Sequence, residues 1–282
     1  MAATTLPTNR PRPQKPQAIL EVVDAWDLPS GLRRVVLGGD GFAQYQDNEF
    51  SDRYVKFLFA DEQLEPPYDL DAIRATQPEL LPKRRTYTVR QAEHEAQQLT
   101  VDFFVHGDEG VAGPWARRAL PGERAVITGA GGKYAPRSDA DWHLFVGDLA
   151  ALPAISQSLE RLDEHARCQI VLHAPKGIEL DLALPRDAVV VRVDGEAAGD
   201  EAESSPLLEA VASLDWFPGE PQCFVHGERG SMKLLRRHLL TERGVQRELL
   251  SLSAYWAKGR TEDRFQAEKR EPIGQLDRDD AR

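Results

Sequence analysis

The spacing of apolar residues predicts two regions of different architecture, with the change near residue 140. The first region contains short segments in which apolar and polar residues alternate, separated by turn-forming residues. We expect strands over residues 18–25, 32–38, 54–59, 86–91, 98–105 and 124–129. Six short strands of this kind, with one helical turn near 115–118, predict a small antiparallel barrel. Residues 61–83 form an acidic, proline-containing insertion with room for one short helix.

Beyond residue 140, apolar strands alternate with amphipathic helices. The expected strands are 142–146, 169–173, 188–193, 222–226 and 247–256, and the expected helices are 151–163, 206–214 and 231–241. Such alternation is typical of βαβ units and a parallel sheet. We therefore expect an all-β domain over 17–138 and an α/β domain over 139–271, between flexible tails at 1–16 and 272–282.

Composition and charge limit the possible functions. The 282 residues carry a net charge of −11, which argues against a nucleic-acid-binding surface. No apolar run is long enough for a membrane span, and the proline-rich start lacks a signal-peptide core, so we expect a cytoplasmic protein. Two cysteines without a CxxC pair are expected to be buried thiols. The seven histidines lack metal-binding spacing, so we expect no protein-bound metal.

The stretch KRRTYTVR, residues 83–90, carries unusual chemistry for a strand. Strand alternation places Arg85 and Tyr87 on one face and Thr88 on the other. Arginine can bind a phosphate with two hydrogen bonds, tyrosine can stack on a flat ring, and threonine can hydrogen-bond a ring nitrogen. The segment suits a flavin dinucleotide, although an exposed basic edge strand that resists aggregation would look the same.

Two further segments could contact such a ligand. DFFVHGDEGVAGPWA, residues 102–116, leaves a strand and reaches a helix start through small residues, which allow backbone amides to approach a phosphate. A plain loop-to-helix turn with Trp115 buried is the alternative. AYWAKGRTEDRFQAEKRE, residues 254–271, combines aromatic and basic residues and could equally be a solvated amphipathic helix capped by Thr261. Neither a GxGxxG nor a P-loop pattern is present.

Taken in order, five segments resemble the siderophore-interacting protein family, also called FAD-dependent ferric-siderophore reductases, within the ferredoxin–NADP reductase-like superfamily. They are RRTYTVR (84–90), DFFVHGDEGVAGPWA (102–116), PGE and GAGGKY (121–134), VGDLAALPAI (146–155) and YWAKGRTED with EKRE (255–271). The resemblance covers about residues 17–271. It implies a six-stranded antiparallel Greek-key FAD-binding barrel followed by a Rossmann-like parallel-sheet NAD(P)-binding domain.

The resemblance also implies roles for individual residues. Arg85, Thr86, Tyr87 and Thr88 would form a cofactor-binding motif. In it Arg85 would lie at the flavin pyrophosphate, Tyr87 would stack on the isoalloxazine, and Thr88 would hydrogen-bond near N5. Asp102 and His106 would flank the ribityl and adenosine part, with Ala112, Gly113 and Trp115 by the phosphates and adenine. Asp148, Ala151, Leu152 and Pro153 would lie near a nicotinamide dinucleotide.

The implied activity is transfer of electrons from NADPH or NADH through FAD to a ferric siderophore, with reduced ferredoxin as another candidate donor. Lys176 would favour NADPH through a 2′-phosphate, whereas Asp194 and Glu196 would favour NADH. Candidates for a basic substrate rim are Lys83, Arg84, Arg90, Lys258, Arg260 and Arg264, although solvated charges unrelated to substrate would look the same. The alternatives are a general NAD(P)H–flavin reductase of the diaphorase type and a non-catalytic siderophore-binding protein.

Overall fold

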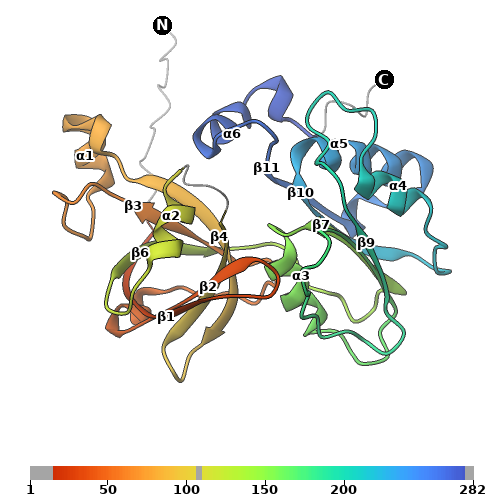
Figure 1. Cartoon of the computed structure of the whole chain (residues 1–282), viewed down its shortest axis with the longest axis horizontal. Coiled ribbons are helices and arrows are strands. Elements are labelled where there is room, and N and C mark those ends of the chain that lie inside the picture. The colour runs from red at the N-terminus through yellow and green to blue at the C-terminus, as the bar shows by residue number, and fades with distance from the viewer. Residues whose placement is uncertain (1–14, 106–109, 277–282) are drawn as a thin grey trace, which may run out of the picture.

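The N-terminal region is a closed antiparallel barrel in the computed structural model, which describes residues 15–105 and 110–276 (Figure 1). Its strands are β1 (Gln17–Asp27), β2 (Leu32–Gly38), β3 (Tyr54–Phe59), β4 (Lys83–Glu93), β5 (Gln98–Phe104) and β6 (Arg124–Gly131). They follow the order β1-β2-β5-β4-β3-β6, which confirms the predicted Greek-key barrel. Closure leaves no strand edge open within the barrel.

The barrel forms because its strands alternate as expected. Leu20, Val35 and Val101 point into the closed core, and each is fully buried. On β4, Tyr87 and Val89 join this core, while Thr86 faces outward. A register shift between Val89 and Gln91 then changes the path of β4 against β5. The same strand therefore presents side chains both to the barrel interior and to the rest of the molecule.

Short helices connect the barrel strands. The 3-10 helix η1 (Asp40–Gln44) follows β2, and the acidic insertion contains α1 (Leu70–Thr76) and the 3-10 turn η2 (Pro78–Leu80). Asp69 caps α1 by accepting hydrogen bonds from the Asp71 and Ala72 amides. Helix α2 (Ala112–Arg118) includes the expected helical turn and packs on β2 and β5.

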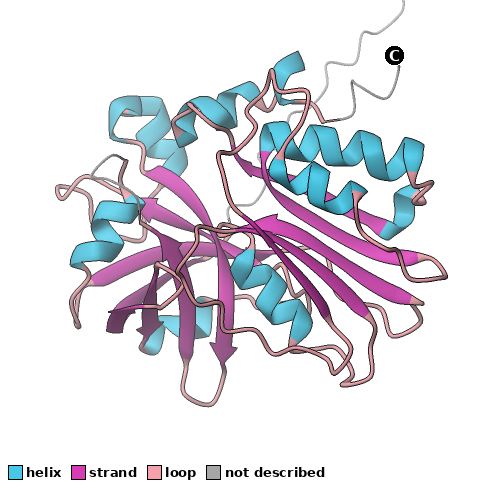
Figure 2. Ribbon diagram, turned by 45° about the vertical axis from the view of Figure 1, so that its right-hand side comes forward, coloured by secondary structure: helices cyan, strands magenta, loops and turns pink. Residues whose placement is uncertain are grey.

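The second region is a five-stranded parallel sheet covered on both faces (Figure 2). Its strands are β7 (Trp142–Asp148), β8 (Cys168–His173), β9 (Val189–Val193), β10 (Pro221–Glu228) and β11 (Leu250–Trp256), in the order β11-β10-β7-β8-β9. Helix α3 (Leu152–Leu159) covers one face and packs against β4 of the barrel. Helices α4 (Pro206–Ala212) and α5 (Arg229–Arg237) cover the other. This arrangement confirms the predicted Rossmann-like domain.

The C-terminal part of the chain returns toward the barrel. After α5 come the π-helical turn η3 (His238–Glu242), the 3-10 turn η4 (Arg247–Leu249), β11 and α6 (Glu262–Glu268). In Figure 1, α6 lies above the gap between the barrel and the sheet. Thr261 caps α6 as expected, because its hydroxyl accepts a hydrogen bond from the Arg264 amide.

Two expectations about this part of the chain need correction. Helix α5 starts at Arg229 rather than at Ser231, because the Glu228 carboxylate caps it by accepting a hydrogen bond from the Ser231 amide at 2.9 Å. The chain also stays folded beyond residue 271. Pro272–Gly274 forms the 3-10 turn η5, and Leu276 packs on the core, where its carbonyl accepts a hydrogen bond from Arg236.

Candidate functional site

Arg85 lies at the junction of the barrel and the C-terminal segment. Its guanidinium donates two hydrogen bonds to the Asp263 carboxylate of α6, at 2.7 and 3.2 Å. The Arg85 side chain is 11% exposed and that of Asp263 is 65% exposed. The predicted phosphate-binding side chain is therefore held beneath α6 in a geometry that suits a planar, two-oxygen anion.

Tyr87 belongs to an aromatic cluster inside the barrel. Its ring centroid lies 4.3 Å from that of Phe103, and Trp115 of α2 contacts the same Phe103 at 5.6 Å. Burial raises the pKa of Tyr87. Tyr87 of β4 and Trp115 of α2, both of which the resemblance places at the flavin, thus meet in one aromatic cluster.

The other residues predicted near a flavin have different surroundings. Asp102 is buried and receives two hydrogen bonds from Arg34, at 2.7 and 2.8 Å, so this carboxylate joins β5 to β2. Ala112 is buried in the barrel core and Gly113 is partly buried at the start of α2. His106 lies outside the described residues. Contacts of these residues with a ligand stay predictions.

Asp148 and the start of α3 are enclosed. The Asp148 carboxylate accepts hydrogen bonds from the Ala150 amide at 2.9 Å and from the Trp256 indole at 2.8 Å. Burial raises the pKa of Asp148, and these hydrogen bonds oppose that rise. Ala151, Leu152 and Pro153 are also buried. The structure therefore gives Asp148 a definite contact, the attachment of β11 to β7, and leaves its predicted contact with a dinucleotide as a prediction.

A polar chain begins next to Thr88, and sequence spacing does not reveal it. Thr88 on β4 is buried, and it lies close enough to the Tyr255 phenol of β11 to offset part of the rise that burial causes in the Tyr255 pKa. The Tyr255 oxygen lies 3.0 Å from Nδ1 of His226, whose Nε2 lies 3.0 Å from the Ser251 hydroxyl. We call Thr88, Tyr255, His226 and Ser251 the hydroxyl–imidazole chain.

A sequence signal for this chain does exist. His226 ends an apolar segment, and Tyr255 lies near the end of another. Parallel strands bring their carboxyl ends to one edge of the sheet. In the structure β10 and β11 are neighbours, so the two side chains meet there. The sequence does not show that Thr88, from the other domain, reaches the same point.

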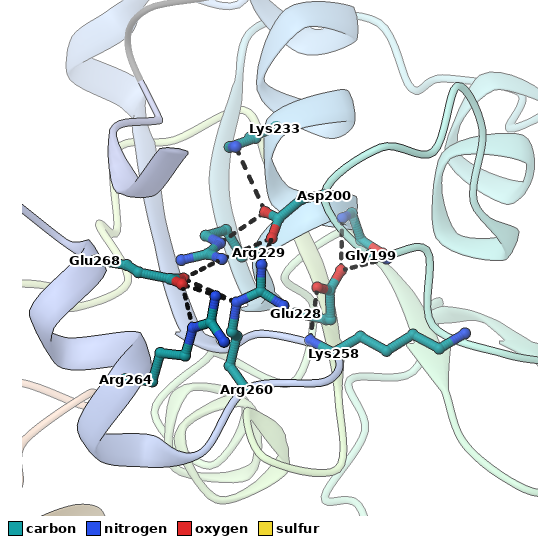
Figure 3. A network of polar contacts seen from close by, with 10 residues as sticks. Gly199, Asp200, Glu228, Arg229, Lys233, Lys258, Arg260, Arg264 and Glu268 are labelled. Atoms are coloured by element: carbon teal, nitrogen blue, oxygen red, sulfur yellow. Dashed lines mark hydrogen bonds and ion pairs between the residues drawn. The ribbon is translucent and has the colours of Figure 1, made fainter. Parts of the chain in front are cut away.

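Much of the predicted basic rim is neutralised by carboxylates (Figure 3). Arg260 and Arg264 both donate hydrogen bonds to Glu268, at 2.8 and 2.9 Å. Lys258 pairs with Glu196 at 2.7 Å. Arg229 is fully buried and bonds both Asp200 and Glu268, a role that no sequence motif indicates. Together, the contacts drawn in Figure 3 attach the loop at 199–200 to α5 and α6.

The remaining candidates for the basic rim lie in two different places on β4. Arg90 pairs with Glu160, which immediately follows α3, and so holds the barrel against the α/β domain. Lys83 and Arg84 are exposed on β4. Burial lowers the pKa of nearby Lys56, and the charges of Arg84 and Lys15 lower it further. Burial also lowers the pKa of Lys269 in the C-terminal segment; the charge of Glu262 opposes this effect and that of Lys56 adds to it. We call Lys15, Lys56, Lys83, Arg84 and Lys269 the β3–β4 basic patch.

A cavity of about 580 Å³ opens where β8 and β9 end. Its lining includes Lys176, Arg192, Asp194 and Glu209. The Lys176 ammonium lies 3.9 Å from the Asp194 carboxylate, so the two residues predicted to favour different dinucleotides face the same space. Within residues 15–105 and 110–276, no group of three or more potential metal ligands occurs, and no helix is long and apolar enough to cross a membrane.

Comparisons with known proteins assign both regions. Residues 21–134 match the family model for the siderophore-interacting FAD-binding domain, and residues 140–259 match the model for siderophore-interacting protein. An uncharacterised protein of Mycobacterium tuberculosis is 40% identical over 276 residues, which cover 91% of this chain and 96% of that protein. The ferric vibriobactin reductase ViuB of Vibrio cholerae is 29% identical over 261 residues, covering 89% of this chain and 93% of ViuB.

Solved structures give the same assignment. The siderophore-interacting protein SipS of Aeromonas hydrophila has a TM-score of 0.78 and 29% identity, covering 93% of this chain and 99% of SipS. The FAD-binding barrel, the parallel sheet and the matched relatives agree over nearly the whole chain. The chain belongs to the siderophore-interacting protein family, a group of FAD-binding proteins with the ferredoxin–NADP reductase-like fold.

Proposed function

We propose that this protein is an FAD-dependent ferric-siderophore reductase that receives its electrons from NADPH or NADH. The observation that carries the proposal is the arrangement on β4. There an arginine presented to a two-oxygen anion, a tyrosine in an aromatic cluster and a buried threonine follow one another at the junction of the two domains. ViuB, which matches most of the chain, supports the same activity by its name.

The chemistry of these side chains fits FAD. Arg85 would bind the pyrophosphate in the geometry that it now uses for Asp263, Tyr87 would offer its ring, and Thr88 would hydrogen-bond near N5. When bound, FAD would supply the exchange between a two-electron hydride donor and a one-electron acceptor. The protein's part is to hold the cofactor and to admit donor and acceptor.

The nicotinamide donor would approach the carboxyl edge of the parallel sheet, where α/β domains bind ligands. The cavity at the ends of β8 and β9 supports this proposal, because it could hold the adenosine part. Lys176 and Arg192 line this cavity together with Asp194, so the lining contains cations for a 2′-phosphate and a carboxylate for ribose hydroxyls. NADPH and NADH therefore both belong in the test, with reduced ferredoxin as the third donor.

The β3–β4 basic patch is our proposed contact for an anionic ferric siderophore. It gathers cations on a protein with a net charge of −11, which would attract an anionic chelate to one face. Lys258, Arg260 and Arg264 are weaker candidates than the sequence suggested, because carboxylates already surround them. Reduction weakens the hold of hard oxygen ligands on iron, so electron transfer would release it.

Anaerobic stopped-flow with the FAD-loaded protein tests the proposal. NADPH, NADH and reduced ferredoxin are compared as donors, and a ferric tris-catecholate siderophore, free FMN and simple dyes as acceptors. We expect reduction of the bound FAD by a nicotinamide donor and a clear preference for the ferric siderophore. Equal efficiency with every acceptor would instead identify a diaphorase-type reductase, and a protein that retains no FAD would be a non-catalytic binder.

A charge-reversal pair tests the basic patch. Lys83→Glu and Arg84→Glu should raise KM for the anionic siderophore but leave KM for a neutral ferric chelate unchanged. Arg186→Glu is the control, because it makes the same change of charge at an exposed arginine of the α/β domain. Equal effects of the patch variants and of the control on KM would exclude this face as the contact.

A further inference from the structure

Helix α3 packs against β4, and a ring of polar contacts holds one on the other. Arg90 of β4 donates two hydrogen bonds to the Glu160 carboxylate, which also accepts one from the Gln157 amide at 2.9 Å. The oxygen of the same amide accepts a hydrogen bond from the Arg53 guanidinium at 3.3 Å. The Arg53 carbonyl accepts one from the Val89 amide at 2.8 Å, next to Arg90 in the chain, which closes the ring. We call Arg53, Arg90, Gln157 and Glu160 the α3 clamp.

Gln157 is the central member of the α3 clamp, because both ends of its buried amide are bonded. The nitrogen donates to Glu160 in its own domain, and the oxygen accepts from Arg53 of the barrel. These two contacts fix which way the amide points. The two-bond pair between Arg90 and Glu160 adds a second directional contact. The clamp therefore fixes how α3 lies on β4, whereas apolar contacts, which have no direction, would let the two elements slide.

The α3 clamp joins the two segments that would hold the reacting partners. Arg90 follows Thr88, the proposed contact of flavin N5, by two positions on β4. Gln157 lies on α3, and the start of this helix carries Leu152 and Pro153, which are predicted to lie near the nicotinamide. The helix has eight residues and is about 12 Å long, so the clamp is close enough to set the position of its start.

We propose that Gln157 is a positioning residue, which acts through the α3 clamp to align the nicotinamide of the donor with the flavin. The inference rests on the proposed function, in which NADPH or NADH supplies the electrons. In that step the C4–H bond of the nicotinamide breaks, an N–H bond forms at N5, and both electrons of the broken bond move with the hydrogen. The nicotinamide is thereby oxidised and the flavin reduced. The reacting atoms must approach to about 3–3.5 Å, and a misplacement of about 1 Å can cost roughly 10²-fold in rate.

Other contacts keep the two domains attached when the α3 clamp is broken. The Ser51 hydroxyl of the barrel lies 2.8 Å from that of Ser158 on α3, and both residues are fully buried. Arg161, just after α3, donates a hydrogen bond to the Glu49 carbonyl. The cavity proposed for the adenosine part lies wholly within the α/β domain. Loss of the clamp should therefore disturb the alignment of the two rings while the domains stay together and the donor still binds.

Two variants break the clamp in different ways. Gln157→Leu removes both amide contacts at similar volume, and Arg90→Met removes the pair with Glu160. In anaerobic stopped-flow of the FAD-loaded protein with NADPH or NADH, the limiting rate of flavin reduction should fall about tenfold or more in both, while Kd for the donor changes less than about twofold. Gln169→Leu is the matched control, because this buried glutamine bonds the Asp215 carbonyl within the α/β domain. It should change neither value.

Two further measurements separate alignment from general damage. Ferricyanide oxidises dithionite-reduced protein without any nicotinamide, so this rate should be the same in the wild type and in both clamp variants. In FAD-free protein, spin labels at Leu120→Cys near the barrel and Leu184→Cys in the α/β domain report the separation of the domains; both positions are exposed, whereas the native cysteines are buried. The distribution of label distances should broaden in both clamp variants and not in the Gln169→Leu control.

Wild-type limiting rates in both clamp variants would overturn the inference, as would weaker donor binding with an unchanged limiting rate. An equal slowing of the nicotinamide and ferricyanide reactions, or an unchanged distribution of label distances in the slowed variants, would also overturn it, because the clamp would then not act through alignment. Failure of the proposed function is a separate result that appears in the wild type itself. A wild type whose bound FAD is reduced by neither NADPH nor NADH would refute the proposed function, and the inference with it.

Discussion

Replacement of Arg85 by Ala should weaken FAD binding, because a charge-assisted contact with the pyrophosphate would be lost. Such contacts contribute roughly 1.5–3 kcal/mol, which corresponds to about a 10- to 150-fold rise in Kd. In the structure, however, the Arg85 guanidinium already bonds Asp263. FAD must displace that carboxylate if Arg85 is its ligand, so part of the gain is offset.

The exposure of the Asp263 side chain determines how much FAD affinity is lost in displacing it from Arg85. The Asp263 side chain is 65% exposed, and ion pairs open to solvent contribute only about 0.2–1 kcal/mol. Asp263→Ala should therefore tighten FAD binding by about 1.4- to 5-fold. In the double variant the Asp263 substitution should add nothing, since its effect operates only through Arg85.

Fluorescence titration of FAD-free protein measures the FAD affinity of the wild type, of the two single variants and of the double variant. Circular dichroism and urea unfolding of the same samples check that each variant is folded. Two results would refute the reasoning. One is wild-type FAD affinity in Arg85→Ala, which would place the pyrophosphate elsewhere, and the other is weaker binding in Asp263→Ala, which would make Asp263 a ligand rather than a competitor.

Three further predictions concern charge and stability. Arg229→Met should lower the free energy of unfolding in urea by about 1–3 kcal/mol, because the bonds of a fully buried guanidinium to Asp200 and Glu268 are lost while other cations still pair with both carboxylates. Arg74→Met in an exposed pair should have little effect. The Arg229 hydrogen bond, with those of Arg264 and Arg260, lowers the pKa of Glu268 from 4.5 to about 2, so its stabilising effect is present above pH 4.5 and is lost as the pH falls toward 2. Glu268→Gln should remove that part of the acid sensitivity, measured as proteolysis of the C-terminal segment across this range. Burial lowers the pKa of His226 from 6.5 to about 3, so the unfolded chain takes up the proton first and stability falls as the pH drops below 6.5. The dependence of the urea midpoint on pH should be shallower in His226→Gln, but not flat, because His143 is lowered to about 4 in the same way; an unchanged slope would contradict the assignment.

The sequence allowed the fold to be predicted because its signals are local. Alternation with period two marked the barrel strands, and apolar strands followed by amphipathic helices marked the parallel sheet. The chemistry of β4 could also be predicted, since Arg85, Tyr87 and Thr88 lie within one short segment. What local patterns omit is the set of partners that folding brings to each side chain.

The basic rim shows this limit most clearly. Arg260 and Arg264 look like free cations in the sequence, but Glu268 on the same helical segment neutralises them. Arg229 meets Asp200, 29 residues away, and becomes fully buried. The hydroxyl–imidazole chain likewise depends on the docking of two domains. Charge and hydroxyl groups acquire their roles from contacts that sequence spacing does not encode.

The pair between Arg85 and Asp263 has a consequence for the order in which the protein is made. The two residues are 178 positions apart, so α6 is synthesised well after the barrel. The barrel can fold while the rest of the chain is still being synthesised, since domains fold largely as units from the N-terminus. During that interval Arg85 has no carboxylate above it. If Arg85 is a ligand of FAD, a nascent barrel should therefore capture FAD more readily than the complete two-domain fold, and insertion of the cofactor during synthesis would be the favoured order of assembly.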